Sequence, residues 1–112
     1  MSLLLCGAHA HELEVSTGLV CDTEVQVTRY FTLMARGEPH ALQIINTDAK
    51  SNVCIFATVA YVKGASKSSV QAENGRYDIV EILVFGFMHE NAWQKLPPTI
   101  QYVGFFEKED GA

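Results

Sequence analysis

The chain contains three cysteines, any two of which could form a disulfide: Cys6, Cys21 and Cys54. Removal of residues 1–10 would leave Cys21 and Cys54, and an even number in an oxidising compartment predicts one disulfide. The two lie 33 positions apart (54 − 21), and a crosslink of that span stabilises a fold by about 3–4 kcal/mol in the chain-entropy model. A pair of buried free thiols is the alternative for a cytosolic chain. There is no C-x-x-C motif, so redox activity is not expected.

The first ten residues are typical of the end of a secretory signal peptide. Leu3 to Leu5 would close its apolar region, and Ala8-His9-Ala10 has the small-x-small form that signal peptidase accepts. Only Met1 and Ser2 precede the leucines, so a basic segment would have to lie upstream; otherwise residues 1–10 are a short native strand or arm. We expect a residual signal segment at 1–10, a single domain at 11–112, and a periplasmic or secreted protein. No apolar run is long enough to predict a transmembrane helix.

The four histidines suggest one specific hypothesis, although no H-E-x-x-H motif is present. If cleavage follows Ala10, His11 becomes the N-terminal residue, and its amine and imidazole could chelate Cu(II) with His40 or His89 as a third nitrogen ligand. The alternative is that His11 is an ordinary exposed residue. We predict no bound cofactor.

The carboxylates do not form an evident acid–base pair. Asp22 and Glu24 suit the N-terminus of a helix, as N-cap and first-turn acid. Glu81 stands in an otherwise apolar strand, where it is either a perturbed functional carboxylate or an exposed residue paired to Arg76 or Lys63. No nucleophile elbow or phosphate-binding glycine loop occurs, so no catalytic residue is predicted.

Three aromatic residues near the C-terminus, Trp93, Tyr102 and Phe105, could form a binding surface. The alternative is that Trp93 covers one end of the core.

Size and charge limit the classes of function. The chain has 112 residues, 48% of them hydrophobic, which predicts one folded domain. With a net charge of −5, the chain lacks the positive surface potential that is typical of a nucleic-acid-binding protein. An anionic membrane surface is disfavoured for the same reason.

Hydrophobic periodicity predicts helices in the first half of the chain. Residues 11–20 form an edge strand or an ordered arm. A helix with Asp22 as N-cap follows, and its apolar face repeats at helical spacing until Gly37: Val27, Tyr30, Phe31 and Met34. A second, shorter helix begins at Pro39 and ends at 46–48, with an apolar face of Ala41, Leu42 and Ile45.

The second half of the chain has the pattern of strands. We expect a strand at 53–62, a polar loop at 64–69 and a hairpin turn at Asn74-Gly75. A central strand at 77–88 follows, in which Gly86 marks a bulge or a close backbone approach. The chain then ends with a loop at 89–98 that contains Pro97-Pro98 and a last strand at 99–107. The predicted fold class is α+β: two N-terminal helices packed on a three- or four-stranded antiparallel β-meander.

The stretch from Leu19 to Phe106 resembles a family of short exported bacterial proteins of unknown function. The matching segments are VCDT at 20–23, ALQIINTD at 41–48, ATVAYVKG at 57–64 and DIVEILVFG at 78–86. The resemblance implies export, one cysteine after the leader and a second cysteine at the start of the first strand. It implies no catalytic residues.

Two functions are consistent with these features. The first is a non-enzymatic interaction or structural module that binds through its sheet face or the 89–98 loop, as a homodimer or with another protein. The second is a periplasmic metal-binding protein or small enzyme using His11, His40, His89 or Glu81.

Overall fold

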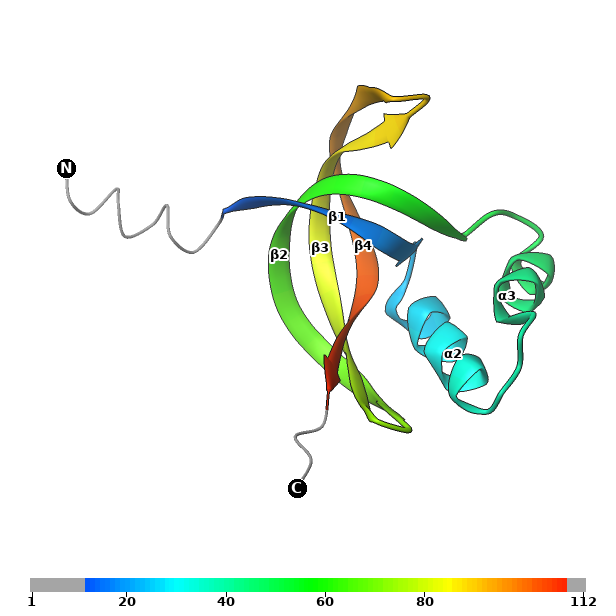
Figure 1. Ribbon diagram of the computed structural model, residues 1–112. Coiled ribbons are helices and arrows are strands. Elements are labelled where there is room, and N and C mark those ends of the chain that lie inside the picture. Colours follow the sequence, from blue (N-terminus) through cyan, green and yellow to red (C-terminus); the bar gives the residue numbers. More distant parts are fainter. Residues whose placement is uncertain (1–11, 109–112) are drawn as a thin grey trace, which may run out of the picture.

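A computed structural model describes residues 12–108 (Figure 1). Its elements in chain order are β1 (Leu13–Cys21), α2 (Glu24–Ala35), α3 (Ala41–Ala49), β2 (Cys54–Ala72), β3 (Gly75–His89) and β4 (Ala92–Lys108). The strands pair antiparallel in the order β1-β2-β3-β4, and one further pair, Cys21 with Tyr102, joins β1 to β4. The sheet therefore closes on itself, with both helices lying to one side of it. The predicted signal segment lies outside the described residues.

The α+β class and the antiparallel meander β2-β3-β4 are confirmed, but the order of elements is not. The helices are not N-terminal: β1 precedes them and pairs with β2 along its whole length, from Leu13 with Val62 to Cys21 with Cys54. Apolar and polar residues alternate from Leu13 to Ser16, but Thr17 and Gly18 interrupt the pattern before the buried Leu19. For this reason the sequence did not distinguish a strand from an arm.

The helices pack on the outer face of the sheet. Within α2, Val27, Tyr30 and Phe31 are buried as predicted, whereas Met34 is 44% exposed and Leu33 packs against the core in its place. The ring of Phe31 stacks on Tyr77 of β3 with ring centroids 4.0 Å apart. The rest of this cluster comes from α3 and the strands: Leu19, Cys21, Ala41, Ile45, Cys54, Val70 and Ile79.

A second core lies on the inner face of the closed sheet. Successive strand residues point to opposite faces, so Ile79 packs under the helices while Val80 packs in this inner cluster. Strand β3 is covered on both faces, as its apolar run predicts. All four strands contribute to the inner cluster: Val20, Val59, Tyr61, Val80, Ile82, Val84 and Val103.

Helix α2 begins one residue later than predicted. Thr23, not Asp22, is the N-cap: the Gln26 N–H donates to Thr23 Oγ1 (3.2 Å) and the Thr23 N–H donates to Gln26 Oε1 (3.0 Å). This is a capping box, and its T-x-x-Q signature is present in the sequence. The Asp22 carboxylate instead accepts a hydrogen bond from the Gln101 side chain (3.2 Å).

The predicted polar loop at 64–69 is wrong, because this segment continues β2. Its register against β3 shifts twice, between Lys63 and Ser66 and between Ser66 and Ser68. Bulges of this kind bend a strand and break its alternation, which removes the pattern by which a strand is recognised. The hairpin after it is confirmed, but its two-residue turn is Glu73-Asn74 rather than Asn74-Gly75, because Ala72 pairs with Gly75. A side chain at Gly75 would collide with the carbonyl oxygen of Glu107 on β4.

The predicted loop at 89–98 is also wrong. Glu90 and Asn91, with φ of 49° and 65°, form a tight turn between β3 and β4. The register passes from Gly86–Lys95 directly to Val84–Thr99, so residues 96–98 on β4 lie opposite Phe85 alone. Pro97 and Pro98 are tolerated in this bulge because no regular ladder hydrogen bond is required of them. Of the two features predicted at Gly86, the bulge is found at the neighbouring Phe85, which has no partner on β2 between the pairs Ala60–Gly86 and Tyr61–Val84.

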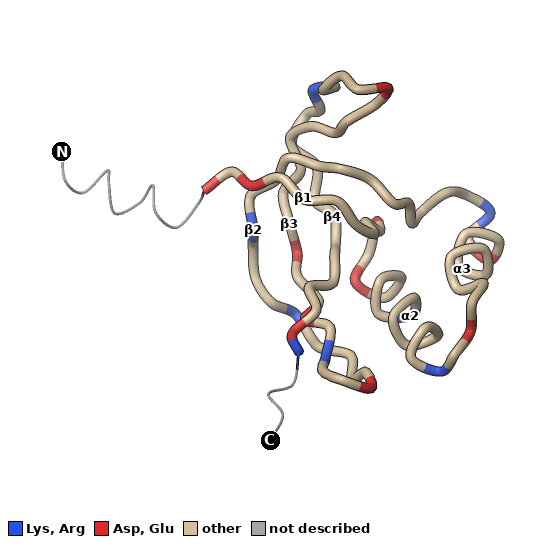
Figure 2. The backbone as a smooth tube through the Cα atoms, viewed as in Figure 1, with Lys and Arg blue, Asp and Glu red and all other residues tan. Residues whose placement is uncertain are grey.

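Charged residues are dispersed over the described part of the chain (Figure 2). Ion pairs join Arg29 to Asp48 (2.7 Å) and Arg76 to Glu107 (2.6 Å). Within residues 12–108, no helix has the length and apolar character needed to cross a membrane.

Burial makes the fold sensitive to alkali through two tyrosines. Desolvation raises the pKa of Tyr30 and of Tyr61 above the ordinary value of 10.0, and the nearby Glu14 carboxylate adds to the shift at Tyr61. A raised pKa in the folded state means that stability is complete below pH 10 and falls as pH rises through the folded-state pKa.

We therefore expect the free energy of unfolding to decline above pH 10, and Tyr61→Phe to reduce the slope of that decline. Denaturant unfolding at a series of pH values, followed by tyrosinate absorbance, measures both. An identical slope in the wild type and in Tyr61→Phe would contradict the burial of this hydroxyl.

Candidate functional site

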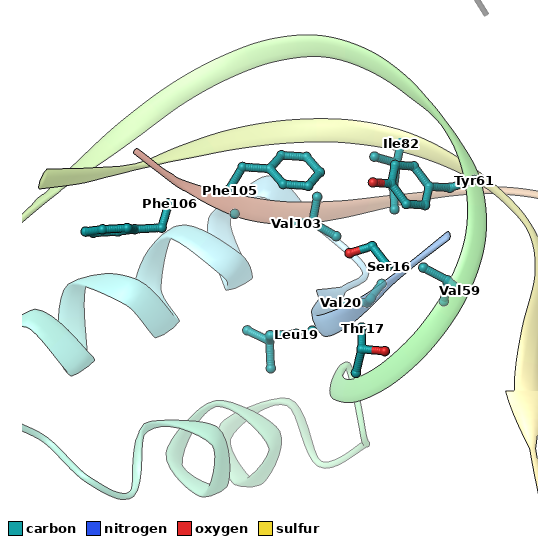
Figure 3. Close-up of a pocket in the computed structure, with 12 residues that line it drawn as sticks. Ser16, Thr17, Leu19, Val20, Val59, Tyr61, Ile82, Val103, Phe105 and Phe106 are labelled. Atoms are coloured by element: carbon teal, nitrogen blue, oxygen red, sulfur yellow. The ribbon is translucent and has the colours of Figure 1, made fainter. Parts of the chain in front are cut away.

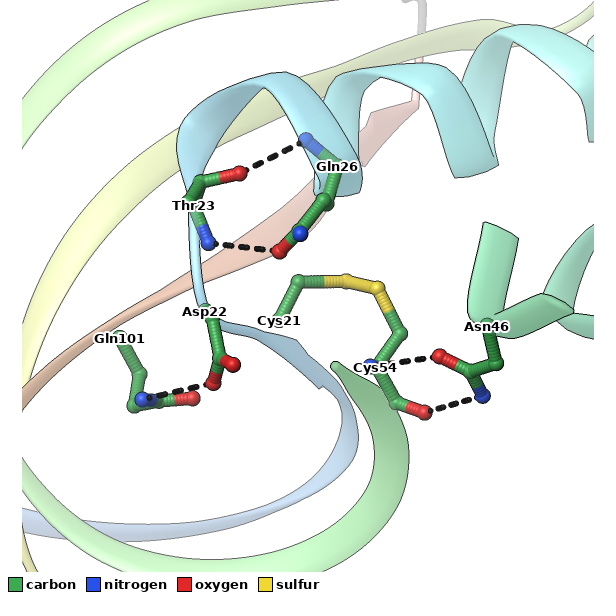
Figure 4. Close-up of a disulfide and its surroundings, with 7 residues drawn as sticks. All are labelled: Cys21, Asp22, Thr23, Gln26, Asn46, Cys54 and Gln101. Atoms are coloured by element: carbon green, nitrogen blue, oxygen red, sulfur yellow. Dashed lines mark hydrogen bonds between the residues drawn. A yellow bond between two sulfur atoms is a disulfide. The ribbon is translucent and has the colours of Figure 1, made fainter. Parts of the chain in front are cut away.

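Cys21 and Cys54 form a disulfide, as predicted (Figure 4). The two residues are a cross-strand pair with Cα atoms 4.1 Å apart, and both are fully buried. Cys21 is the last residue of β1 and Cys54 is the first residue of β2. The bond therefore joins the two ends of the segment that contains both helices. It also joins two neighbouring strands of the sheet.

Hydrogen bonds around the disulfide hold α3 against the start of β2. The Asn46 side chain donates to the Cys54 carbonyl (2.9 Å) and accepts from the Cys54 N–H (3.0 Å) (Figure 4). The Asp22 N–H donates to the carbonyl of Val53 (3.0 Å). The Asn46 side chain thus satisfies both backbone groups of the buried Cys54, and these bonds fix the end of α3 relative to β2.

The residues of the metal or enzyme hypothesis lie on separate elements. His11 lies outside the described residues. His40 is exposed at the start of α3, next to Glu38, and His89 is exposed at the tip of the β3–β4 hairpin, next to Glu90. Among residues 12–108, no three His, Cys, Asp or Glu side chains gather closely enough to hold a metal ion.

Glu81 is half-buried on the outer face. Its partner is Lys67 (3.3 Å), and the Tyr102 hydroxyl donates to it (3.4 Å). The partners expected from the sequence are engaged elsewhere: Arg76 pairs with Glu107, and Lys63 Nζ lies 4.7 Å from the centroid of the Phe105 ring.

The three aromatic residues predicted as a surface are not brought together. Tyr102 pairs with Glu81 and Phe105 with Asp78, and residues three apart on a strand face opposite sides of the sheet. Trp93 pairs with Met88 near the hairpin tip, far along β3 from both. Of the three, only Trp93 lines an exposed apolar surface.

That surface, here called the outer groove, has a volume of about 390 Å³. Leu13 and Val15 of β1 are 62% and 59% exposed, and Trp93 is 48% exposed. The groove lies beside an unpaired strand edge, because among the described residues β1 pairs with β4 only at Cys21. Its lining comes from all four strands: Leu13, Val15, Ala60, Phe85, Gly86, Trp93, Gln94 and Lys95.

A second space, the inner cavity, lies inside the closed sheet and has a volume of about 150 Å³. Figure 3 shows Tyr61, Ile82 and Val103 turned towards this space, whereas Phe106 points away from it. Two segments border it along the line where β1 and β4 diverge, residues 16–20 and 103–106. Strand alternation indicates which residues face inward, but it carries no information about volume, so no sequence pattern predicts this cavity.

Comparison with known proteins found no matching family model, no similar curated protein and no similar solved structure.

Removal of the disulfide should destabilise the fold substantially. We expect the double variant Cys21→Ala/Cys54→Ala to lose about 3–4 kcal/mol of unfolding free energy, because the unfolded chain regains the freedom of a 33-residue separation. Urea unfolding of the variant and of the reduced wild type should give the same loss. Equal stability of the oxidised and reduced wild type would show that the disulfide does not stabilise the fold.

Asn46→Ala should lower the free energy of unfolding by about 1–3 kcal/mol, because it leaves the buried N–H and the buried carbonyl of Cys54 without partners. Asn52→Ala, at an exposed position between α3 and β2, is the matched control and should change stability by about 0.5 kcal/mol or less. A similar loss in both variants would exclude a specific role for the Asn46 bonds.

Proposed function

We propose that this protein is a non-enzymatic interaction or structural module of an oxidising compartment, periplasmic or extracellular, and that it assembles as a homodimer through the free edge of β1. The observation that carries the proposal is the outer groove, which places exposed apolar side chains directly beside an unpaired strand edge. The Cys21–Cys54 disulfide is compatible with such a compartment.

The edge of β1 supplies the polar half of the interface. Strand β1 pairs with β2 on one side, and on its other side its backbone groups before Cys21 have no strand partner among the described residues. Such an edge is a template for another strand. A second copy of β1 can add to it antiparallel, since a two-fold interface brings the same surface of both copies together.

The outer groove supplies the apolar half. A two-fold axis through Val15, perpendicular to the sheet, sets Val15 against its own equivalent and keeps the two grooves on the same face. In this register Glu14 lies opposite Ser16 of the second copy, so like charges do not meet directly. Neighbouring exposed apolar residues of this size are typical of interaction sites, and a tryptophan is a common anchor there.

Light scattering coupled to size exclusion tests the proposal, with a dimeric mass expected for the wild type. Val15→Lys would place two lysines against each other, and such like-charge contacts cost several kcal/mol; we expect dimer affinity to fall about 100-fold or more. Val25→Lys is the matched control, because Val25 is 76% exposed on α2 outside the outer groove. It should leave the dimer intact.

A wild type that stays monomeric at high concentration would overturn the homodimer. Equal weakening by Val15→Lys and Val25→Lys would show that any dimer forms elsewhere.

A further inference from the structure

We propose that the inner cavity is a binding site for a small neutral molecule, an apolar ring or branched chain that carries a single hydroxyl group. The site borders β1, as the outer groove does, but it lies on the inner face of the sheet and shares no lining residue with the outer groove.

The volume of the cavity sets the size of the ligand. A cavity of about 150 Å³ matches the engineered apolar cavities that accept benzene. Its wall is divided about equally between polar and apolar surface, and all four strands contribute to the apolar part: Val20, Val59, Ile82, Val103 and Phe105. A ligand of roughly six to eight non-hydrogen atoms would fill this space, since a benzene-sized cavity holds a single ring.

One wall of the cavity is polar. Tyr61, which is only 3% exposed, and Ser16 both line the cavity, and Ser16 pairs with Val59, two residues before Tyr61 on β2. Serine and tyrosine hydroxyls each donate one hydrogen bond and accept others. A single ligand hydroxyl can donate a hydrogen bond to these hydroxyls or accept one from them. A purely apolar ligand would leave them without a partner on the ligand.

The lining of the cavity argues against an ionic ligand. None of the described residues that line it carries a charged side chain, so burial of a charge there would be uncompensated.

Gly18 gives a direct means of filling the site. It lies on the cavity wall, and a Cβ atom placed on it would meet no atom within 4 Å. Its φ is not in the positive range, so a larger residue is compatible with the strand, and valine has a high strand propensity. Gly18→Val therefore occupies the cavity without straining β1.

The experiment is an NMR titration of the oxidised wild type with phenol, toluene and benzoate as probes. We expect phenol to shift the resonances of Ser16, Tyr61 and Val103 saturably. Toluene should bind about 2- to 10-fold more weakly because it lacks the hydroxyl hydrogen bond, and benzoate should not bind. At a free concentration about five times its Kd, phenol should also raise the Tm of the protein by about 4–8 °C.

Two variants test the location. Gly18→Val should abolish the phenol-induced shifts and the rise in Tm, while Val25→Ala, on the exposed side of α2, should keep both. Ser16→Ala should bring phenol binding down towards that of toluene and leave toluene unchanged.

Three results would overturn the proposal. The first is a wild type that binds none of the probes, in which case the cavity holds water only. The second is phenol binding that persists unchanged in Gly18→Val, and the third is benzoate binding as tight as that of phenol.

Discussion

The Cys21–Cys54 pair is the constraint on which the rest of the structure depends. The chain leaves the sheet after Cys21, forms both helices and returns at Cys54, so one covalent bond fixes the two ends of the helical segment. Among residues 12–108, Cys21 also makes the single pairing between β1 and β4, opposite Tyr102. The same residue thus closes the sheet and anchors the helices. In a domain of this size, a contribution of about 3–4 kcal/mol is a large part of the net stability.

Closure of the sheet gives its two faces different roles. The outer face is covered by α2 and α3 at one end, where Phe31 and Tyr77 stack, and is exposed at the other end, where the outer groove lies. The inner face encloses its own cluster and leaves the inner cavity unfilled beside Gly18. Both spaces border β1, because this strand meets β4 at one point and diverges from it elsewhere.

Those features of the fold that have strong local signals could be predicted from the sequence. The face of α2 that carries Val27, Tyr30 and Phe31 follows from helical spacing, and the central position of β3 follows from its apolar run. The disulfide followed from counting cysteines, although which elements it joins did not. The T-x-x-Q capping box at Thr23 is a sequence signal too, but Asp22, one residue earlier, also suits an N-cap position.

Other features could not be predicted because tertiary context overrides the local pattern. The polar segment 64–69 is a strand only because bulges fit it against β3. Pro97 and Pro98 are compatible with β4 only because three residues there lie opposite Phe85 alone. The partners of Glu81 depended on the register, which placed Lys67 rather than Lys63 or Arg76 within reach. Neither the outer groove nor the inner cavity has a sequence signature, since each combines short pieces of several strands.

The most direct test is peptide mapping of the protein isolated from its own host without reductant, with free thiols alkylated at lysis. The structure predicts a crosslinked peptide pair that contains Cys21 and Cys54. Recovery of Cys21 and Cys54 in separate, alkylated peptides, or of either joined to Cys6, would contradict the account.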